Sequence, residues 1–204
     1  MTTSYNLDER TVNPYPIRQF QQWLRDAGQA AIVLPEAMAV ATVSRTGQPS
    51  VRMVLLKEVD EKGFVFFTNY DSRKGKEISE NPRVELLFWW SAIERQVRIE
   101  GSIEKVTAQE SDEYFRTRPR ESQISAYASP QSAVISSREE LNNMVRKIEQ
   151  QYHNNEIPRP KNWGGLRVRP FRIEFWEGKR ARLHDRILYT RTPEGIWKIS
   201  RLAQ

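Results

Sequence analysis

The chain has 204 residues, and its 32 Lys and Arg against 26 Asp and Glu give a net charge of +6. This length suits one domain with a sizeable core, and 38% hydrophobic with 28% charged residues is typical of a folded soluble protein. The lack of cysteine excludes disulfides, thiol catalysis and cysteine-ligated metals, and two histidines are too few for a multi-histidine metal site. We therefore predict no bound metal.

The sequence carries no visible membrane or export signal. No apolar run approaches the roughly 20 residues that span a bilayer. The first ten residues lack the basic-then-apolar pattern of a signal peptide. We therefore expect a cytoplasmic protein that does not enter the membrane.

Hydrophobic periodicity divides the chain into an N-terminal helix followed by strands and short helices. In the first helix Phe20, Trp23 and Leu24 recur at helical spacing. The predicted helices cover residues 16–29, 72–80 and 107–116, and a fourth begins at 137 and continues through 148. The predicted strands cover residues 37–44, 50–59, 64–68, 84–90, 96–106, 166–176, 181–190 and 196–202, and residues 154–163 form a loop.

These eight strands are joined by hairpin-type connections, and the alternation of strand and helix is too irregular for a doubly wound parallel sheet. The predicted fold class is therefore mainly β with peripheral helices. We expect the sheet to close into a β-barrel, because closure removes exposed edges. Residues 1–15 are predicted to be an N-terminal arm, flexible or lid-like, and residues 16–204 a single domain.

The positive charge predicts an anionic ligand, either nucleic acid or a small phosphorylated molecule. The basic residues are dispersed along the chain, which favours discrete pockets over one nucleic-acid-binding stripe. Neither a G-x-G-x-x-G nor a Walker phosphate loop occurs. Any phosphate site must therefore be built from dispersed side chains and helix ends.

Two pairs of cations are candidate phosphate ligands. Arg73 and Lys74 follow the predicted cap Ser72, where cations oppose the helix dipole unless a phosphate neutralises them. Arg52 and Lys57 flank an apolar run, and their commoner interpretation is a core strand with charged ends. Because positions five apart face opposite sides of a regular strand, a ligand shared by these two residues requires a bend.

Two further clusters combine polar groups that suit an electron-rich ligand. Tyr114 and Arg118 are i, i+4 neighbours if the helix extends that far, which suits a phosphate as well as a solvated helix end. In the predicted strand 181–190, alternation places Arg182, His184 and Arg186 on one face. A charged, exposed edge strand is the commoner explanation of that pattern. The other histidine, in a polar stretch at position 153, is interpreted as solvated.

Together these segments resemble the pyridoxine/pyridoxamine 5′-phosphate oxidase family. The strongest similarity is the run Ile173-Glu-Phe-Trp176, followed after five residues by Arg182-Leu-His184-Asp-Arg186. Also similar are residues 52–57, 67–69, 72–74, 95–97, 114–124, 131–132, 163–165 and 197–203. The similarity runs from residue 16 to the last residues in the same order. The arginine-rich, tyrosine-containing N-terminal arm of the family has no clear match in residues 1–15.

The resemblance implies an FMN-binding split β-barrel that works as a homodimer, with flavin at the subunit interface and a C-terminal dimerisation and substrate region. It implies oxidation of pyridoxine or pyridoxamine 5′-phosphate to pyridoxal 5′-phosphate, with dioxygen reduced to hydrogen peroxide. By motif position it places the catalytic pair Arg182 and His184 against the substrate ring, and the substrate phosphate on Lys57, Tyr114, Arg118 and Ser122. The flavin contacts implied in the same way are Arg52, Met53, Val54, Leu55, Leu56, Lys57, Phe67, Thr68, Arg73, Lys74, Gln96, Gln131, Ser132, Trp176 and Arg186.

Three alternatives remain open. An FMN oxidase of the same fold acting on another ring, as in phenazine biosynthesis, does not need the phosphate set at Lys57, Tyr114, Arg118 and Ser122. A flavin- or pyridoxal-phosphate-binding protein without turnover does not need Arg182 and His184. A nucleic-acid module predicts strongly salt-dependent binding and a colourless protein.

Overall fold

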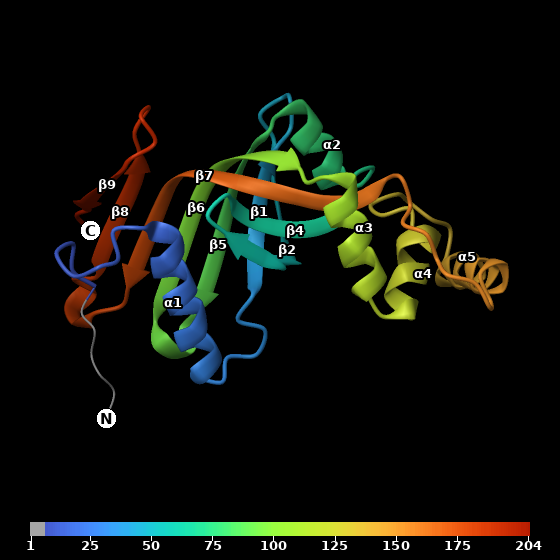
Figure 1. The fold of residues 1–204 in the computed structure, drawn as a ribbon, viewed down its shortest axis with the longest axis horizontal. Helices are drawn as coiled ribbons and strands as arrows, with labels where there is room; N and C mark the ends of the chain where they lie inside the picture. Colours follow the sequence, from blue (N-terminus) through green and yellow to red (C-terminus); the bar gives the residue numbers. More distant parts are fainter. Residues whose placement is uncertain (1–6) are drawn as a thin grey trace.

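One nine-stranded antiparallel sheet organises residues 7–204, the part of the chain that this computed structural model describes. The strands are β1 Ala37–Val43, β2 Pro49–Leu55, β3 Glu58–Asp60, β4 Gly63–Asn69, β5 Arg83–Trp90, β6 Arg95–Lys105, β7 Trp163–Glu177, β8 Asp185–Arg191 and β9 Trp197–Arg201. Their order is β2-β1-β5-β6-β7-β4-β3, and β8 and β9 continue from β7. Because the long strand β7 pairs with β6, β4 and β8, it joins both halves of the curled sheet (Figure 1).

Five α-helices lie around the sheet, and Figure 1 shows α3, α4 and α5 together at one end, opposite β8 and β9. The helices are α1 Pro16–Gln29, α2 Arg73–Glu80, α3 Ala108–Thr117, α4 Arg120–Ala128 and α5 Arg138–Gln151. The bounds of α1 match the prediction, and Ser72 caps α2 by accepting a hydrogen bond from Gly75 N–H at 3.3 Å. Thr107 and Glu110 form the predicted capping box of α3. The sequence pattern missed α4.

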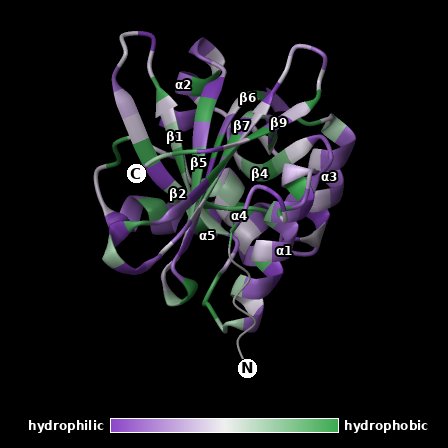
Figure 2. Cartoon of the chain, turned by 90° about the vertical axis from the view of Figure 1, so that its left-hand side faces the viewer, coloured by the Kyte–Doolittle hydropathy of each residue, from purple (hydrophilic) through white to green (hydrophobic). Residues whose placement is uncertain are grey.

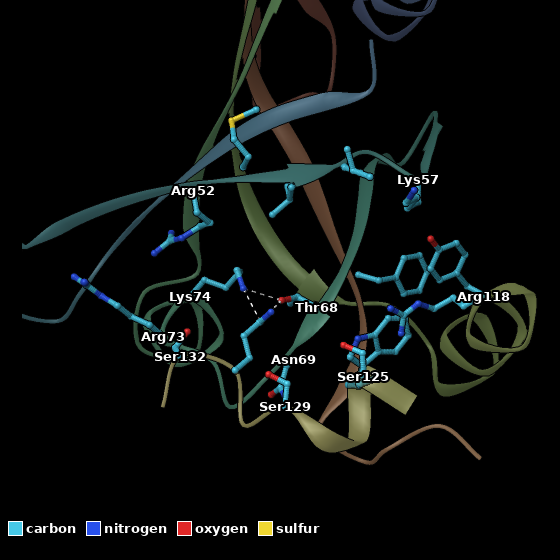
Figure 3. Close-up of a pocket in the computed structure, with 18 residues that line it drawn as sticks. Arg52, Lys57, Thr68, Asn69, Arg73, Lys74, Arg118, Ser125, Ser129 and Ser132 are labelled. Atoms are coloured by element: carbon cyan, nitrogen blue, oxygen red, sulfur yellow. Dashed lines mark hydrogen bonds between the residues drawn. The ribbon is translucent and has the colours of Figure 1, made fainter. Parts of the chain in front are cut away.

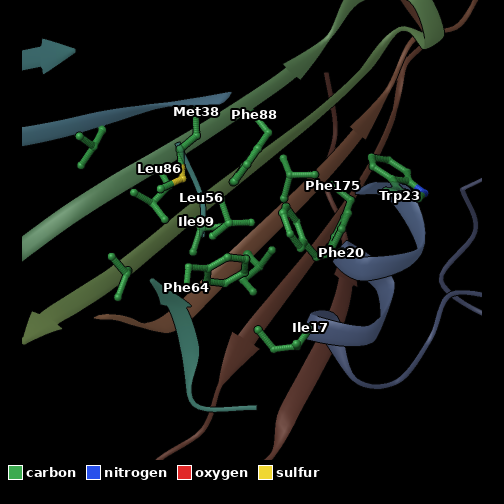
Figure 4. Close-up of a cluster of buried hydrophobic side chains, with 14 of the residues drawn as sticks. Ile17, Phe20, Trp23, Met38, Leu56, Phe64, Leu86, Phe88, Ile99 and Phe175 are labelled. Carbon is green, nitrogen blue, oxygen red and sulfur yellow. The ribbon is translucent and has the colours of Figure 1, made fainter. Parts of the chain in front are cut away.

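The core lies between α1 and one face of the sheet (Figure 4). Phe20 of α1 is fully buried, and its ring meets Phe64 edge-on at 4.9 Å and Phe88 at 4.8 Å between centroids. Trp23, one helical turn later, packs edge-on against Phe175 at 5.1 Å. Figure 2 shows that hydrophobic segments gather in the central strands, whereas the projecting loops are largely hydrophilic.

The opposite face of the sheet is only partly covered. In β5, Leu86, Phe88 and Trp90 are buried, whereas the alternate residues Leu87 and Trp89 are 36% and 52% exposed. Cross-strand partners share a face, so the outer face can be followed from strand to strand. It includes Val51, Met53, Ala39, Ala41, Leu87, Trp89, Gln96, Arg98, Glu174, Trp176, Arg186 and Leu188. We call this surface the outer sheet face.

Strand β7 contains a bulge that decides which of its side chains reach the core. Residue 101 of β6 pairs with Pro170 and residue 100 pairs with Arg172, so Phe171 is an extra residue on β7. Before the bulge the even-numbered Leu166 and Val168 are buried, and after it the odd-numbered Ile173 and Phe175 are buried. Proline fits here because a bulge relaxes the hydrogen-bond ladder that proline cannot complete.

Residues 7–15 lie against the β7–β9 end of the sheet. Leu7 is buried, its N–H donates to Glu177 Oε2 at 3.4 Å, and Asn13 O accepts a hydrogen bond from the Tyr189 hydroxyl at 2.7 Å. Arg201 forms ion pairs with Glu9 and Asp185 at 2.7 and 2.6 Å. The first six residues of the predicted N-terminal arm lie outside the described residues, and its lid role stays a prediction. No helix within residues 7–204 combines the length and apolar character needed to cross a bilayer.

Two predicted strands differ from the structure. The run 50–59 is divided at Leu56 and Lys57, which separates β2 from β3 and provides the bend that a ligand shared by Arg52 and Lys57 requires. The strand predicted over 181–190 begins only at Asp185, because residues 180–182 form a 3₁₀ turn. Ala181 and Arg182 have φ of 57° and 60°, which excludes extended backbone. The alternation argument that placed Arg182 and His184 on one strand face is therefore wrong.

Candidate active site

A cavity of about 630 Å³ opens between β2, β4, the start of α2 and the α3–α4 segment (Figure 3). This volume lies within the usual range of small-molecule and cofactor sites. Five cations and no carboxylate are among the described residues that line it. The lining residues are Arg52, Met53, Val54, Leu55, Lys57, Phe67, Thr68, Asn69, Arg73, Lys74, Tyr114, Arg118, Ser125, Ala126, Ser129, Gln131, Ser132 and Trp163.

The cations form two groups at opposite ends of the cavity. Arg52, Arg73 and Lys74 lie together at one end, whereas Lys57 and Arg118 lie at the other (Figure 3). The first group comes from β2 and the start of α2, and the second from the β2–β3 bend and the end of α3. The cavity therefore offers two separate sites for anionic groups.

Lys74 is the most buried cation of the first group, with 8% of its surface exposed. Its ammonium donates to Gln131 Oε1 at 2.8 Å, Thr68 Oγ1 at 3.0 Å and Ser72 Oγ at 3.3 Å, all neutral oxygens. Burial and, second to it, the charge of Arg52 together lower the pKa of Lys74 to about 8. A dianion in the cavity would supply the negative charge that this ammonium lacks.

The other two cations of this group share the buried carboxylate Glu77. Arg73 Nε donates to Glu77 Oε1 at 2.8 Å and Arg52 Nη2 donates to Oε2 at 3.2 Å. Burial opposes ionisation of Glu77, but hydrogen bonds from Thr42, Arg73, Ser50 and Arg52 outweigh it and lower its pKa to about 2. The prediction that only a ligand neutralises Arg73 is wrong, because Glu77, one helical turn later, is its ion-pair partner.

The second group contains a guanidinium held by aromatic rings. Arg118, the residue that ends α3, has its guanidinium carbon 4.5 Å from the ring centroid of Trp163. Its Nη1 is buried and has no hydrogen-bond partner within the described residues. Tyr114 lies one turn earlier, as predicted, and stacks on Phe67 at 3.8 Å. An anion placed between Arg118 and Lys57 would satisfy the unpaired nitrogen.

Not all of the predicted site residues meet in this cavity. Leu56 belongs to the hydrophobic core with 5% exposure, and Ser122 of α4 does not line the cavity, although Ser125 of the same helix does. The remaining predicted residues, Gln96, Trp176, Arg182, His184 and Arg186, lie near the other end of β7.

Four of these residues form a second cluster at the outer sheet face, and Arg182 lies in the 3₁₀ turn that precedes His184. Gln96, Trp176 and Arg186 are direct cross-strand neighbours, and the His184 ring lies 4.5 Å from that of Trp176. His184 Nδ1 accepts a hydrogen bond from the Lys179 N–H at 3.0 Å, so a neutral imidazole carries its proton on Nε2. Buried Glu174 fixes Arg186 through Nε at 2.8 Å.

The two clusters belong to opposite ends of one strand. Trp163, which lines the cavity, begins β7, and Trp176 is next to its last residue. At about 3.3 Å per residue, roughly 40 Å of strand separates them. A small ligand bound against Trp163 is therefore too short to reach Trp176 of the same chain.

Five cavity residues, Asn69, Ser125, Ala126, Ser129 and Trp163, were missed as site residues. Ser125 and Ser129 are separated by one turn at the end of α4, a helix that the sequence pattern did not reveal. Trp163 stood in a recognised motif with two glycines, which was the available signal. The reason for those glycines is steric: a Cβ on Gly164 would lie 2.2 Å from Tyr70 Oη, and one on Gly165 would lie 2.9 Å from the Phe67 ring.

Comparison with known proteins places these observations in a family. Residues 24–152 match the model described as pyridoxamine 5′-phosphate oxidase, and residues 163–203 match the pyridoxine 5′-phosphate oxidase C-terminal dimerisation region. The chain belongs to the pyridoxamine 5′-phosphate oxidase family. The family predicted from the sequence is thereby confirmed.

Curated relatives match over nearly the whole chain. A pyridoxine/pyridoxamine 5′-phosphate oxidase of Trichormus variabilis is 53% identical over 197 residues, covering 97% of this chain and 92% of the relative. One of Burkholderia thailandensis is 52% identical over 208 residues, covering 100% and 97%.

Solved structures confirm the split-barrel fold. PhzG from Burkholderia lata, in complex with tetrahydrophenazine-1-carboxylic acid, superposes with a TM-score of 0.91 at 29% identity over 97% of this chain and 96% of that one. A pyridoxamine 5′-phosphate oxidase-related, FMN-binding protein from Nostoc punctiforme has a TM-score of 0.75 at 16% identity, covering 93% and 98%, and supports the fold alone.

Proposed function

We propose that this chain is an FMN-dependent oxidase that converts pyridoxine 5′-phosphate and pyridoxamine 5′-phosphate to pyridoxal 5′-phosphate, with dioxygen as acceptor and hydrogen peroxide as product. The observation that carries the proposal is the pair of cation groups at opposite ends of one cavity (Figure 3). A phosphorylated flavin beside a phosphorylated substrate needs two phosphate sites. The names and near-complete overlap of the relatives support the same activity.

The first cation group fits the phosphate of FMN. Arg52, Arg73 and Lys74 carry three positive charges and Glu77 one negative, so the group is matched in charge to a phosphate dianion. Gln131 and Ser132 lie beside Lys74 and extend the set of polar contacts. The edge of β2 from Met53 to Leu55 forms an adjoining wall that suits a flat ring.

The second group fits the phosphate of the substrate. Lys57, Tyr114 and Arg118 present an ammonium, a hydroxyl and an unpaired guanidinium nitrogen on one side of the cavity. Charge-assisted hydrogen bonds of this kind are the strong ones in proteins, and a guanidinium matches phosphate oxygens in pairs. A substrate without a phosphate would leave these cations unneutralised in a partly buried site.

FMN, when bound, supplies the hydride acceptor and passes the electrons to dioxygen. The chain's own residues bind and orient the substrate. Arg182 and His184 are the proposed ring contacts, and His184 donates from Nε2 because its Nδ1 is occupied by the Lys179 N–H. We propose that this donor and the guanidinium of Arg182 together stabilise negative charge on a ring oxygen.

We propose that a second copy of the chain brings the two clusters together. About 40 Å of β7 separates Trp163 in the cavity from Trp176, whose ring contacts His184. The outer sheet face is continuous from Val51 and Met53 to Trp176, and Met53 lines the cavity itself. Pairing of this face in a homodimer would place the second cluster of one chain at the cavity of its partner.

The dimer is tested with Trp89→Asp, a change at an exposed position of the outer sheet face. We expect a monomer by sedimentation that retains the circular dichroism of the parent and binds flavin more weakly. Glu61→Gln, at an exposed turn, is the control that stays dimeric. A Trp89→Asp protein that remains a dimer with full flavin occupancy would contradict this interface.

The activity is tested anaerobically in one cuvette. Addition of pyridoxine 5′-phosphate to the FMN-loaded protein should bleach the flavin absorbance, and air should restore it with release of hydrogen peroxide. Pyridoxamine 5′-phosphate should act in the same way. Bound flavin that neither compound bleaches would refute the proposed substrates.

The alternative is an oxidase acting on another ring, because PhzG has the same fold and was solved with a phenazine precursor. The cations at Lys57 and Arg118 favour a phosphorylated substrate over that carboxylic acid. Bleaching by a dihydrophenazine carboxylic acid but not by the B6 phosphates would reverse this choice. A cytoplasmic role in vitamin B6 salvage follows from the proposed reaction and stays a prediction.

A further inference from the structure

Arg118 differs from the other partly buried arginines of the described residues in what holds it. No hydrogen bond or ion pair of its guanidinium occurs within the described residues, and its Nη1 is buried without a partner. Its contacts are ring faces: Trp163 at 4.5 Å and Phe115 at 5.8 Å from the guanidinium carbon. Burial lowers the pKa of Arg118, and guanidinium remains charged in proteins at any physiological pH.

Arg95 provides the comparison within the same chain. Its guanidinium also lies 4.5 Å from a tryptophan ring, that of Trp23. Two of its nitrogens, however, donate to Asp26 at 2.7 Å and Glu177 at 3.0 Å. Arg95 is thus a structural cation, whereas Arg118 has the same ring contact without the carboxylates.

The difference matters because a carboxylate partner competes with an anionic ligand for the guanidinium, whereas a ring face does not. A carboxylate occupies the N–H donors and cancels the charge that an incoming anion would meet. A ring face attracts the cation through its quadrupole and leaves the donors at the guanidinium edge free. An arginine held only by a ring is therefore oriented and still able to form paired hydrogen bonds with phosphate oxygens.

The position of the Trp163 ring is itself fixed relative to the helix that carries Arg118. Trp163 O accepts from Arg159 Nη1 at 2.6 Å, and Arg159 Nε donates to Asp112 of α3 at 2.6 Å. The ring also stacks with Phe67, at 5.5 Å between ring centroids and 16° between ring planes. The ring is 6% exposed, so it has little freedom to turn away from Arg118.

We propose that Trp163 is a positioning residue that holds Arg118 ready for the phosphate of the substrate and thereby sets the preference for phosphorylated over non-phosphorylated substrates. This inference rests on the proposed function, because it assigns a task within that site. Trp163 acts through Arg118 and need not touch the reacting atoms. Its ring face is the feature that matters, so another aromatic residue should replace it in part.

The test compares Trp163→Leu and Trp163→Phe in the FMN-loaded enzyme. Loss of a partly buried cation–π contact corresponds to about 3- to 30-fold in affinity. We expect Trp163→Leu to raise the KM for pyridoxine 5′-phosphate by about that factor, with a smaller change in kcat. Trp163→Phe should recover part of the loss, because it keeps a ring face. Trp197→Leu, at a partly buried tryptophan of β9, is the control whose KM should stay unchanged.

A second readout separates this inference from the proposed function. Titration of the FMN-loaded protein with pyridoxal 5′-phosphate and with pyridoxal measures phosphate preference without turnover. We expect Trp163→Leu to weaken only the phosphorylated ligand. Equal loss for both ligands, or equal loss in the Leu and Phe variants, would overturn the role of Trp163. If the parent enzyme shows no turnover but its preference for the phosphorylated ligand still depends on Trp163, the proposed oxidase activity is refuted and the positioning role of Trp163 is not.

Discussion

The charge state of Lys74 should control how tightly the protein binds FMN. Burial lowers the pKa of this ammonium from 10.5 to about 8, and its hydrogen-bond partners are all neutral. Because the pKa in the fold is below the ordinary value, the charged form destabilises the flavin-free fold. That cost is present in full below pH 8 and disappears as the pH rises from about 8 to 10.5.

The size of the effect follows from the same shift. A difference of 2.5 between the two pKa values corresponds to about 3 kcal/mol at pH 7. A bound phosphate dianion favours the charged ammonium, so FMN affinity should be nearly constant between about pH 7 and 8, where the phosphate is a dianion, and fall above pH 8. At pH 9 about one-tenth of the Lys74 side chains in the flavin-free protein are charged, which weakens FMN binding about tenfold relative to pH 7.

Fluorescence titration of the flavin-free protein between pH 7 and 9 measures this dependence. FMN should lose affinity above pH 8, whereas riboflavin, which has no phosphate, should not. In Lys74→Met the FMN affinity should be weaker at pH 7 and independent of pH, and the flavin-free protein should unfold at higher temperature. A parallel decline for FMN and riboflavin, or an unchanged slope in Lys74→Met, would refute the reasoning.

Three further predictions concern the supports of the site. In acid, the parent should lose stability as the pH falls from 4.5 towards 2 because the pKa of Glu77 is held at about 2; urea unfolding of Glu77→Gln should lack this part of the loss. Gly164→Ala should lower the unfolding free energy by about 1–3 kcal/mol, since its Cβ would overlap Tyr70 and Ser111, and an unchanged melting temperature would count against it. At Ala181, whose φ is 57°, valine should destabilise and glycine should stabilise by up to about 1 kcal/mol; calorimetry showing the reverse order would contradict the strain.

Local signals in the sequence were sufficient where one element decides the outcome. The helix at 16–29 has apolar residues at helical spacing. Ser72 begins the next helix, and its hydroxyl accepts a hydrogen bond from the N–H of Gly75. In each case the pattern and the tertiary contacts agree, so the short-range prediction holds.

The prediction failed where backbone geometry or a distant partner decides. Residues 181–184 have strand-like side chains, but two consecutive residues with positive φ turn the chain there. The segment 120–128 is helical although its sequence has little amphipathic pattern. Its Ile124 packs into a small second core with Phe115 and Trp163, and Ala126 and Tyr127 pack against that core. Such packing depends on contacts between distant segments, and the hydrophobic periodicity within one segment does not predict those contacts.

The candidate site was predictable in its membership more than in its arrangement. Motif similarity implied fifteen flavin residues, and eleven of them line the cavity. It did not indicate that Gln96, Trp176 and Arg186 stand at the opposite end of β7. Nor did it indicate that Glu77, outside the predicted set, balances two of the cations.

The single extra residue in β7 determines which face of the sheet each later residue of the strand occupies. With Phe171 in place, Phe175 enters the core and Trp176 faces outward beside Gln96. Deletion of Phe171 would exchange the two faces for every later residue of β7, so that Trp176 would point into the core and Phe175 away from it. The residues before the bulge, which include the cavity end, would keep their register. One extra residue thus lets the cavity and the second cluster, at separate ends of β7, both have the side-chain orientation that a shared core requires.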